Sequence, residues 1–134
     1  MKKEVLFFAL IGLLFSCNND DSNNYSETEL IGRWKLAETL ADPGDGSGTF
    51  STVISEKIIQ FHADGIVTSN GTLCDLSILS ETPSNGTYSM TELTISSSEC
   101  VSSGLGISFE LSSSILIMNY PCIEPCKAKF IKIE

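Results

Sequence analysis

Apolar and polar residues alternate with a period of two along much of the chain from residue 32 onward. Residues 107–111, Ile-Ser-Phe-Glu-Leu, show the alternation most clearly. This spacing places successive side chains on opposite faces of a strand, so that one face is buried and the other is solvated. From residue 32 onward, no window of 11–18 residues has the i, i+3, i+4, i+7 spacing of an amphipathic helix. The pattern therefore predicts an all-β domain.

Turn-forming residues divide this region into predicted strands. Asp64-Gly65 is a strong hairpin signal, Asn85-Gly86 marks another boundary, and residues 41–48 have the composition of a loop. Ser26, followed three residues later by Glu29, has the spacing of a capping box and predicts one short helical turn before the strands. The eight predicted strands are 33–40, 53–62, 66–74, 87–90, 93–98, 107–111, 115–120 and 128–133.

Eight strands with short connections predict an antiparallel up-and-down barrel. A flat sheet of this size would leave two edges unpaired and one apolar face exposed, and closure removes both problems. A two-sheet β-sandwich is the alternative. The interior of an eight-stranded barrel is either filled by side chains or holds one small ligand.

The N-terminal segment reads as an export signal. Lys2-Lys3 precede the apolar run 5–15, whose helix would span about 17 Å at about 1.5 Å per residue, against a hydrocarbon layer of about 30 Å. The run is therefore too short to cross a membrane and is typical of a secretory signal. Residues 14–17, Leu-Phe-Ser-Cys, resemble the lipobox of bacterial lipoproteins, which implies cleavage after Ser16 and acylation of Cys17 by chains such as palmitate. An ordinary cleaved signal and an uncleaved anchor are the alternatives.

This resemblance divides the chain into a signal peptide (1–16), a lipid-anchored tether (17–29) and a barrel domain (30–134). Residues 18–24 are polar and lack apolar periodicity, as in a flexible tether. Their acidic residues, directly after the acylated cysteine, resemble the surface-export signals of some Gram-negative lipoproteins. We therefore expect an outer-membrane protein on the cell surface, with the periplasmic face as the alternative.

The cysteines agree with export. After Cys17, four remain, and an even number in an oxidising compartment predicts two disulfides. Among the three possible pairings we favour Cys74–Cys100 and Cys122–Cys126, because the latter two flank a proline-containing turn. A zinc site is the alternative, but Cys-x-x-Cys spacing does not occur.

Charge and motifs predict little chemistry. The net charge is −9 and the few cations are scattered, so a nucleic-acid partner is not expected. His62 is the single histidine and no Gly-x-Ser-x-Gly motif occurs, so we expect His62 to be solvated or hydrogen-bonded and the protein not to be an enzyme. Asp42 and Asp45 suggest a calcium loop, but Gly44 and Val53 stand where that loop needs oxygen ligands. We therefore expect neither a metal nor a cofactor.

Residues 32–34, Gly-Arg-Trp, resemble the first-strand Gly-x-Trp motif of lipocalins and of short bacterial lipocalin-like lipoproteins. Residues 61–65 and 86–88 resemble the second-to-third strand turn and the fourth strand of that group. The resemblance implies a barrel in which Trp34 closes one end. In the family an arginine of the last strand often covers this tryptophan, and here only a lysine could take its place. The candidates are Lys127, Lys129 and Lys132.

Two functions follow from these expectations. The first is that of a monomeric membrane-anchored carrier that binds a small apolar or amphipathic ligand in the barrel mouth. The second is that of a surface module with a filled barrel, whose loops bind a protein or a glycan. Large side chains meeting at the barrel centre would favour the second. The predicted lining residues of the first are Trp34 at the floor with Leu36, Phe61, Tyr88, Phe109, Met118 and Tyr120.

Overall fold

A computed structural model describes residues 25–100 and 106–134. The predicted lipobox, Cys17 and the polar tether up to residue 24 lie outside the described residues. Within these ranges, no helix is long and apolar enough to span a membrane. The elements are α1 (Glu27–Leu30), β1 (Gly32–Ala41), β2 (Ser51–Thr52), β3 (Ile58–Phe61), β4 (Ile66–Ser69), β5 (Ser84–Ser89), β6 (Thr94–Ser96), β7 (Ile107–Ser112), β8 (Ile115–Asn119) and β9 (Cys126–Lys132).

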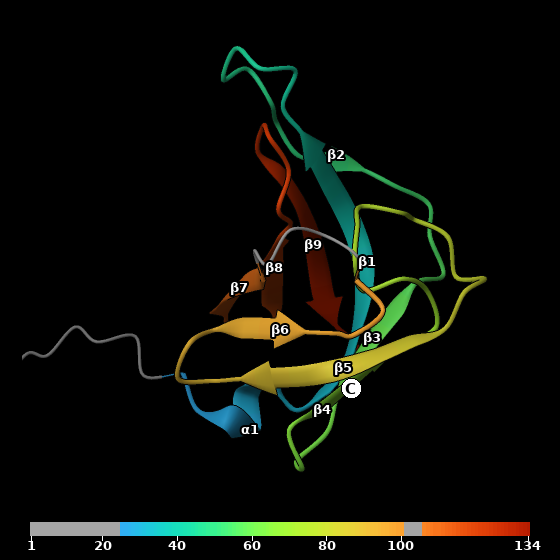
Figure 1. The fold of residues 1–134 in the computed structure, drawn as a ribbon, viewed down its shortest axis with the longest axis vertical. Helices are drawn as coiled ribbons and strands as arrows, with labels where there is room; N and C mark the ends of the chain where they lie inside the picture. Colours follow the sequence, from blue (N-terminus) through green and yellow to red (C-terminus); the bar gives the residue numbers. More distant parts are fainter. Residues whose placement is uncertain (1–24, 101–105) are drawn as a thin grey trace, which may run out of the picture.

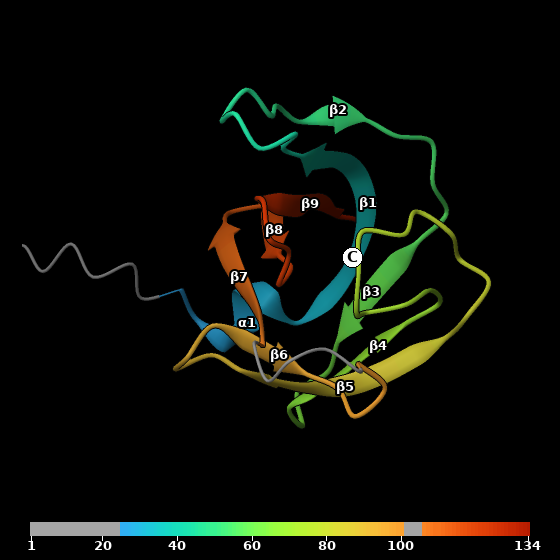
Figure 2. The same ribbon diagram turned by 45° about the horizontal axis from the view of Figure 1, so that its top comes forward.

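The strands form a closed antiparallel barrel, which confirms the predicted fold (Figures 1 and 2). From β3 to β9 each strand pairs with the next one in sequence, and β1 pairs with both β3 and β9. The β1–β9 ladder runs from Trp34↔Lys132 to Ala41↔Cys126, with an irregularity between Leu36 and Glu38. This ladder closes the barrel, so the eight main strands have neighbours on both sides.

The predicted strand 53–62 is too long, because β3 is the one strand within that range and β2 precedes it. Both β2 and β3 lie along the same edge of β1, and residues 53–57 interrupt the ladder between them. The interruption stays beside β1 through hydrogen bonds from the N–H of Leu36 to the carbonyl of Lys57 and from the N–H of Val53 to the carbonyl of Ala37, each 3.0 Å long.

The predicted strand 66–74 is also too long, because β4 ends at Ser69. The Asn70 side chain instead bonds the backbone at the start of β3: it accepts from the N–H of Ile58 at 2.7 Å and donates to the carbonyl of Glu56 at 2.9 Å. The chain after it leaves β4 and returns to the sheet only at Ser84.

The two ends of the barrel differ. The turns 62–65, 90–93 and 113–114 share one end with α1, which we name the closed end. Because the strands alternate in direction, the longer connections 42–50, 70–83 and 120–125 all lie at the other end, the loop end. In Figure 1, α1 lies toward the bottom, and loops 42–50 and 120–125 rise toward the top.

The capping box starts α1 as predicted: the backbone N–H of Ser26 donates to the Glu29 carboxylate at 3.0 Å. Gly32 then follows with φ +130°, and a Cβ there would collide with the carbonyl oxygen of Glu134. Only glycine fits both conditions, because other residues are strained at such a φ. The glycine of the Gly-x-Trp motif therefore lets β1 begin tightly against the C-terminal residue.

The core occupies the barrel interior, where aromatic side chains from distant strands meet. The Phe61 ring lies 6.0 Å from the Phe109 ring and 5.2 Å from the Tyr88 ring, measured between centroids. The largest apolar side chains that are fully buried are Trp34, Phe61, Phe109, Phe130, Leu30, Ile59, Leu73, Ile95, Leu116, Met118 and Val67.

Candidate functional site

The residues predicted to line a ligand cavity belong to the packed core. Six of them are buried in one hydrophobic cluster, and Tyr88 packs against it. The Tyr88 hydroxyl donates to the carbonyl of His62 at 2.5 Å, at the closed end. Three hollows on the surface of the described residues, of about 270, 600 and 460 Å³, are lined by other residues. The structure therefore brings the seven residues together, but they contact one another and their core neighbours.

Trp34 lies where the family resemblance implies, at the closed end. Its indole N–H donates to the carbonyl of Leu30 in α1 at 2.8 Å, so the polar edge of the buried ring is satisfied. The Lys132 Nζ lies 5.3 Å from the ring centroid and also donates to the carbonyl of Glu29 at 2.6 Å. Of the three candidate lysines, Lys132 is therefore the one that lies over the Trp34 ring.

The loop end is covered by residues 70–83, which we name the strap. Leu73, fully buried, inserts from the strap into the core. The Ser84 hydroxyl accepts from the N–H of Leu73 at 2.9 Å and donates to the carbonyl of Gly71 at 2.7 Å. On the other side, the Ser55 hydroxyl donates to the carbonyl of Ile78 at 2.6 Å. Side chain to backbone hydrogen bonds, rather than a ladder, therefore hold the strap.

Both predicted disulfides are present. Cys74–Cys100 fastens the strap to the segment that follows β6, with Cα atoms 5.1 Å apart. Cys122–Cys126 closes the loop between β8 and β9, with Cα atoms 6.0 Å apart. The loop end is thus braced by two covalent links, which suit an oxidising compartment.

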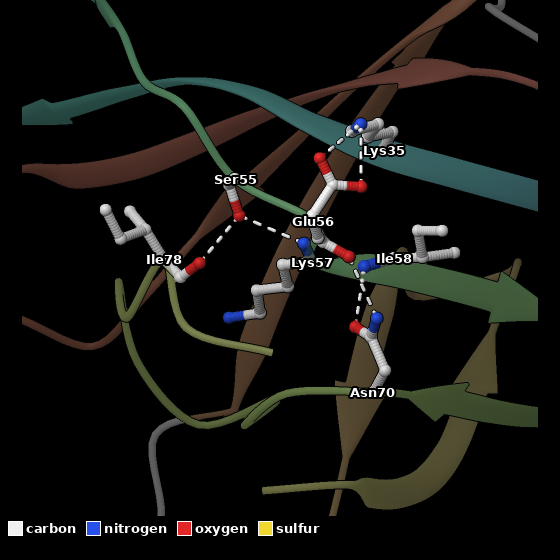
Figure 3. Close-up of polar contacts among 7 residues, drawn as sticks. All are labelled: Lys35, Ser55, Glu56, Lys57, Ile58, Asn70 and Ile78. Atoms are coloured by element: carbon white, nitrogen blue, oxygen red, sulfur yellow. Dashed lines mark hydrogen bonds and ion pairs between the residues drawn. The ribbon is translucent and has the colours of Figure 1, made fainter. Parts of the chain in front are cut away.

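Lys57 lies beneath the strap and is 1% exposed. Its Nζ donates to the carbonyl of Ser77 at 2.8 Å. Figure 3 shows the alternation that buries it: Glu56 points to Lys35 on the outside, and Lys57 points to the other side, toward the segment that carries Ile78. Among the described residues the ion pairs involve other cations and none involves Lys57.

Burial lowers the pKa of Lys57 to about 8, and the nearby Asp75 carboxylate opposes this shift. The same carboxylate, together with burial as the larger cause, raises the pKa of Tyr120. The Tyr120 hydroxyl is buried, and its partner among the described residues is the Met118 sulfur at 4.0 Å, a weak acceptor. An ammonium, a phenol and a carboxylate therefore share the loop end of the barrel.

The sequence reasoning missed Lys57. A signal for it exists, because Ser55, Lys57, Ile59 and Phe61 alternate and the last two are inward-facing core residues. A lysine in phase with core residues is the unusual feature, since lysine is almost never fully buried unless paired.

Replacing Lys57 with methionine is expected to raise the free energy of unfolding at pH 7 by about 1–3 kcal/mol, because an apolar side chain replaces a buried unpaired charge. The folded-state pKa lies below the ordinary 10.5, so the unfolded chain binds the proton more tightly and the cost of the charge is greatest below pH 8. Denaturant titrations of both proteins should show the difference shrinking between pH 8 and 10.5. Lys35→Met, which removes an exposed ion pair, should cost less than about 1 kcal/mol. If the difference in free energy of unfolding between the wild type and Lys57→Met stays constant from pH 8 to 10.5, a buried charge on Lys57 is not its cause.

The other residues considered for chemistry have local structural partners. The Asp42 carboxylate accepts from the N–H of Gly44 at 2.7 Å, of Gly46 at 3.1 Å and of Gly48 at 2.7 Å. These backbone donors lower the pKa of Asp42, and they occupy the oxygens that a cation would need. His62, at the closed end, has a hydrogen-bonded ring as expected, with Nε2 3.0 Å from the Thr68 hydroxyl.

Several apolar side chains are exposed at the loop end. Ile54 is 95% exposed, Leu79 57% and Ile78 39%, and the Ser55–Ile78 hydrogen bond brings their two segments side by side. We name these three residues the apolar rim. Ile123 is also fully exposed, at the tip of the disulfide loop on the same end. Ile66, Ile115, Ile131 and Ile133 are exposed by 37–45% elsewhere on the barrel, so the loop end holds the most exposed apolar side chains rather than all of them. Exposed apolar residues on neighbouring segments are candidates for an interaction site.

Comparisons with protein-family models, with curated proteins and with solved structures found no match for this chain. The resemblance to lipocalin-like lipoproteins therefore stays a prediction that rests on the sequence motifs.

Proposed function

We propose that this protein is a lipid-anchored module of the outer membrane that binds a partner protein through the apolar rim at the loop end of its barrel. The observation that carries the proposal is the distribution of apolar side chains. Large ones fill the interior, and the three that are most exposed among the described residues, Ile123, Ile54 and Leu79, all lie at the loop end.

The filled interior favours this function over that of a carrier. A ligand site of ordinary size needs a cleft or cavity of about 300–1,000 Å³ lined by apolar groups. The residues that were expected to line one contact each other instead, as the contacts of Phe61 with Phe109 and Tyr88 illustrate. A carrier would have to displace packed aromatic rings to admit an apolar molecule.

The chemistry of the rim favours a protein over a glycan. Ile54, Ile78 and Leu79 offer aliphatic surface that gains free energy when it is removed from water. Glycan hydroxyls require hydrogen-bonding partners, which aliphatic side chains do not supply. A protein partner with a complementary apolar pocket, surrounded by a polar border, fits the rim better.

The position of α1 supports the proposed orientation. The chain enters the barrel through α1 at the closed end. A lipid anchor at Cys17 would therefore hold the closed end toward the membrane and leave the loop end facing outward. The two disulfides are consistent with such an extracytoplasmic location.

Photo-crosslinking in an exporting Gram-negative host tests the partner. A photoreactive amino acid at position 54 or 79 is expected to give a discrete protein adduct, and one at Glu92, exposed in a closed-end turn, is expected to give none. The double substitution Ile54→Glu and Leu79→Glu should lower the yield of the adduct formed from position 78 by about 30-fold. This is the effect of losing a contact worth about 2 kcal/mol.

Two outcomes would contradict the proposal. Adducts of equal yield from the rim and from position 92 would mean that the rim has no special affinity. A Cys17→Ala variant that still sediments with the membrane would remove the lipid anchor. Conversely, an apolar molecule too large for the space beneath the strap, found by native mass spectrometry to be released on denaturation, would favour the carrier.

A further inference from the structure

The loop end holds a buried cation whose hydrogen-bonding capacity is not used up. An ammonium group has three N–H donors, and Ser77 of the strap is the acceptor that Lys57 Nζ has among the described residues. A charge buried without a counter-ion is costly, and proteins normally pair it or bind an ion of opposite sign there. Asp75 is near enough to influence Lys57 but forms no ion pair with it.

We propose that Lys57 is the anchor of a binding site for a short monocarboxylate beneath the strap, in which the carboxylate replaces the Ser77 carbonyl as the acceptor of the Nζ. The two carboxylate oxygens would accept from the donor that Ser77 gives up and from a donor of Lys57 that has no partner among the described residues.

The charge balance selects a singly charged ligand. The site has one buried cation, Asp75 lies nearby, and the whole chain carries a net charge of −9. A phosphate or a dicarboxylate would bring a second negative charge that nothing beneath the strap neutralises. The Coulomb repulsion of that charge in a low-dielectric setting disfavours such ligands.

The filled core selects a short ligand. Leu73 and Ile59 are fully buried next to this region, so the space for an apolar tail is limited to what the strap releases when it moves. Two hydrogen bonds, Lys57 to Ser77 and Ser55 to Ile78, hold residues 77–78 to the barrel. The Cys74–Cys100 link fixes the strap on its other side, so residues 75–79 are the part that would lift.

Side-chain NMR of the full chain in detergent micelles, with lysines labelled at Nζ and Cε, tests the site. Sodium butyrate is titrated at constant ionic strength, with chloride and sulfate as comparison salts. The Lys57 resonances, assigned through the bonds from the backbone, are expected to shift saturably with butyrate. The other lysine resonances should shift little.

Two variants make the test specific. Lys57→Met, read through the backbone amides of the strap, should weaken butyrate binding at least about tenfold, a loss of about 1.4 kcal/mol. The matched control, Lys35→Met on the outer face, should leave the affinity unchanged. A Lys57 resonance that does not saturate with butyrate overturns the proposal, even if Lys57→Met fails to fold. Equal affinity for sulfate, or equal loss in both variants, overturns it as well.

Discussion

Replacing Trp34 with alanine is expected to lower the free energy of unfolding by about 3–5 kcal/mol, because its fully buried indole fills the closed end of the barrel. The loss includes the hydrogen bond to the carbonyl of Leu30, which would leave a buried acceptor unpaired. Denaturant unfolding followed by far-ultraviolet circular dichroism measures the effect, since the substitution removes the tryptophan fluorescence.

The control for this prediction is Ile123→Ala. Ile123 is large and apolar but fully exposed, so its truncation should change the stability by no more than about 0.5 kcal/mol. A Trp34→Ala protein that unfolds within 1 kcal/mol of the wild type would mean that the indole does not hold α1 against the barrel.

Removing the Cys74–Cys100 disulfide with paired alanine substitutions is expected to cost about 3.5 kcal/mol, from the loop entropy of its 26-residue separation. Removing Cys122–Cys126, whose separation is 4, should cost about 2 kcal/mol by the same argument. Denaturant titrations compare both variants with the oxidised wild type. An unchanged dependence of the free energy of unfolding on denaturant concentration indicates that the unfolded chains expose similar surface.

The order of the two losses is the informative result. If removing Cys122–Cys126 costs more free energy of unfolding than removing Cys74–Cys100, then contacts in the folded loop before β9 outweigh the entropy of the unfolded chain. Limited proteolysis gives a second measure, since freeing Cys74 should expose the strap to cleavage before the barrel unfolds.

Much of the barrel could be predicted from the sequence because its strands have one buried face. Residues 107–112 alternate without exception, and β7 is buried and exposed in strict alternation. Asp64-Gly65 marked the turn before β4, and the spacing of Ser26 and Glu29 marked the start of α1. In each case the local pattern and the tertiary environment favour the same structure.

The predictions failed where the tertiary structure overrides the local pattern. Residues 53–57 have β-branched residues, yet the chain bulges there and turns Lys57 inward. Residues 70–74 continue a strand-like run, but the disulfide at Cys74 and the Ser84 hydrogen bonds draw them across the barrel end. Neither contact is local in sequence, so a pattern in a short window carries no trace of it.

Sequence patterns have the same limit when they are used to predict the candidate site. Phe61 and Phe109 were expected to face the barrel interior, and they do. Whether inward aromatic rings line a cavity or fill it depends on the distances between strands that are far apart along the chain. Only the structure gives the 6.0 Å between these two rings.

The ladder between β1 and β9 also sets the order of events when the chain is made. Ribosomes produce β1 first and β9 last, so one edge of β1 has no partner until nearly all of the polypeptide exists. The fold therefore completes late. The same delay exposes a nascent edge that can pair with other unfinished chains, so holding chaperones should matter more for this protein than for a helical bundle of its size.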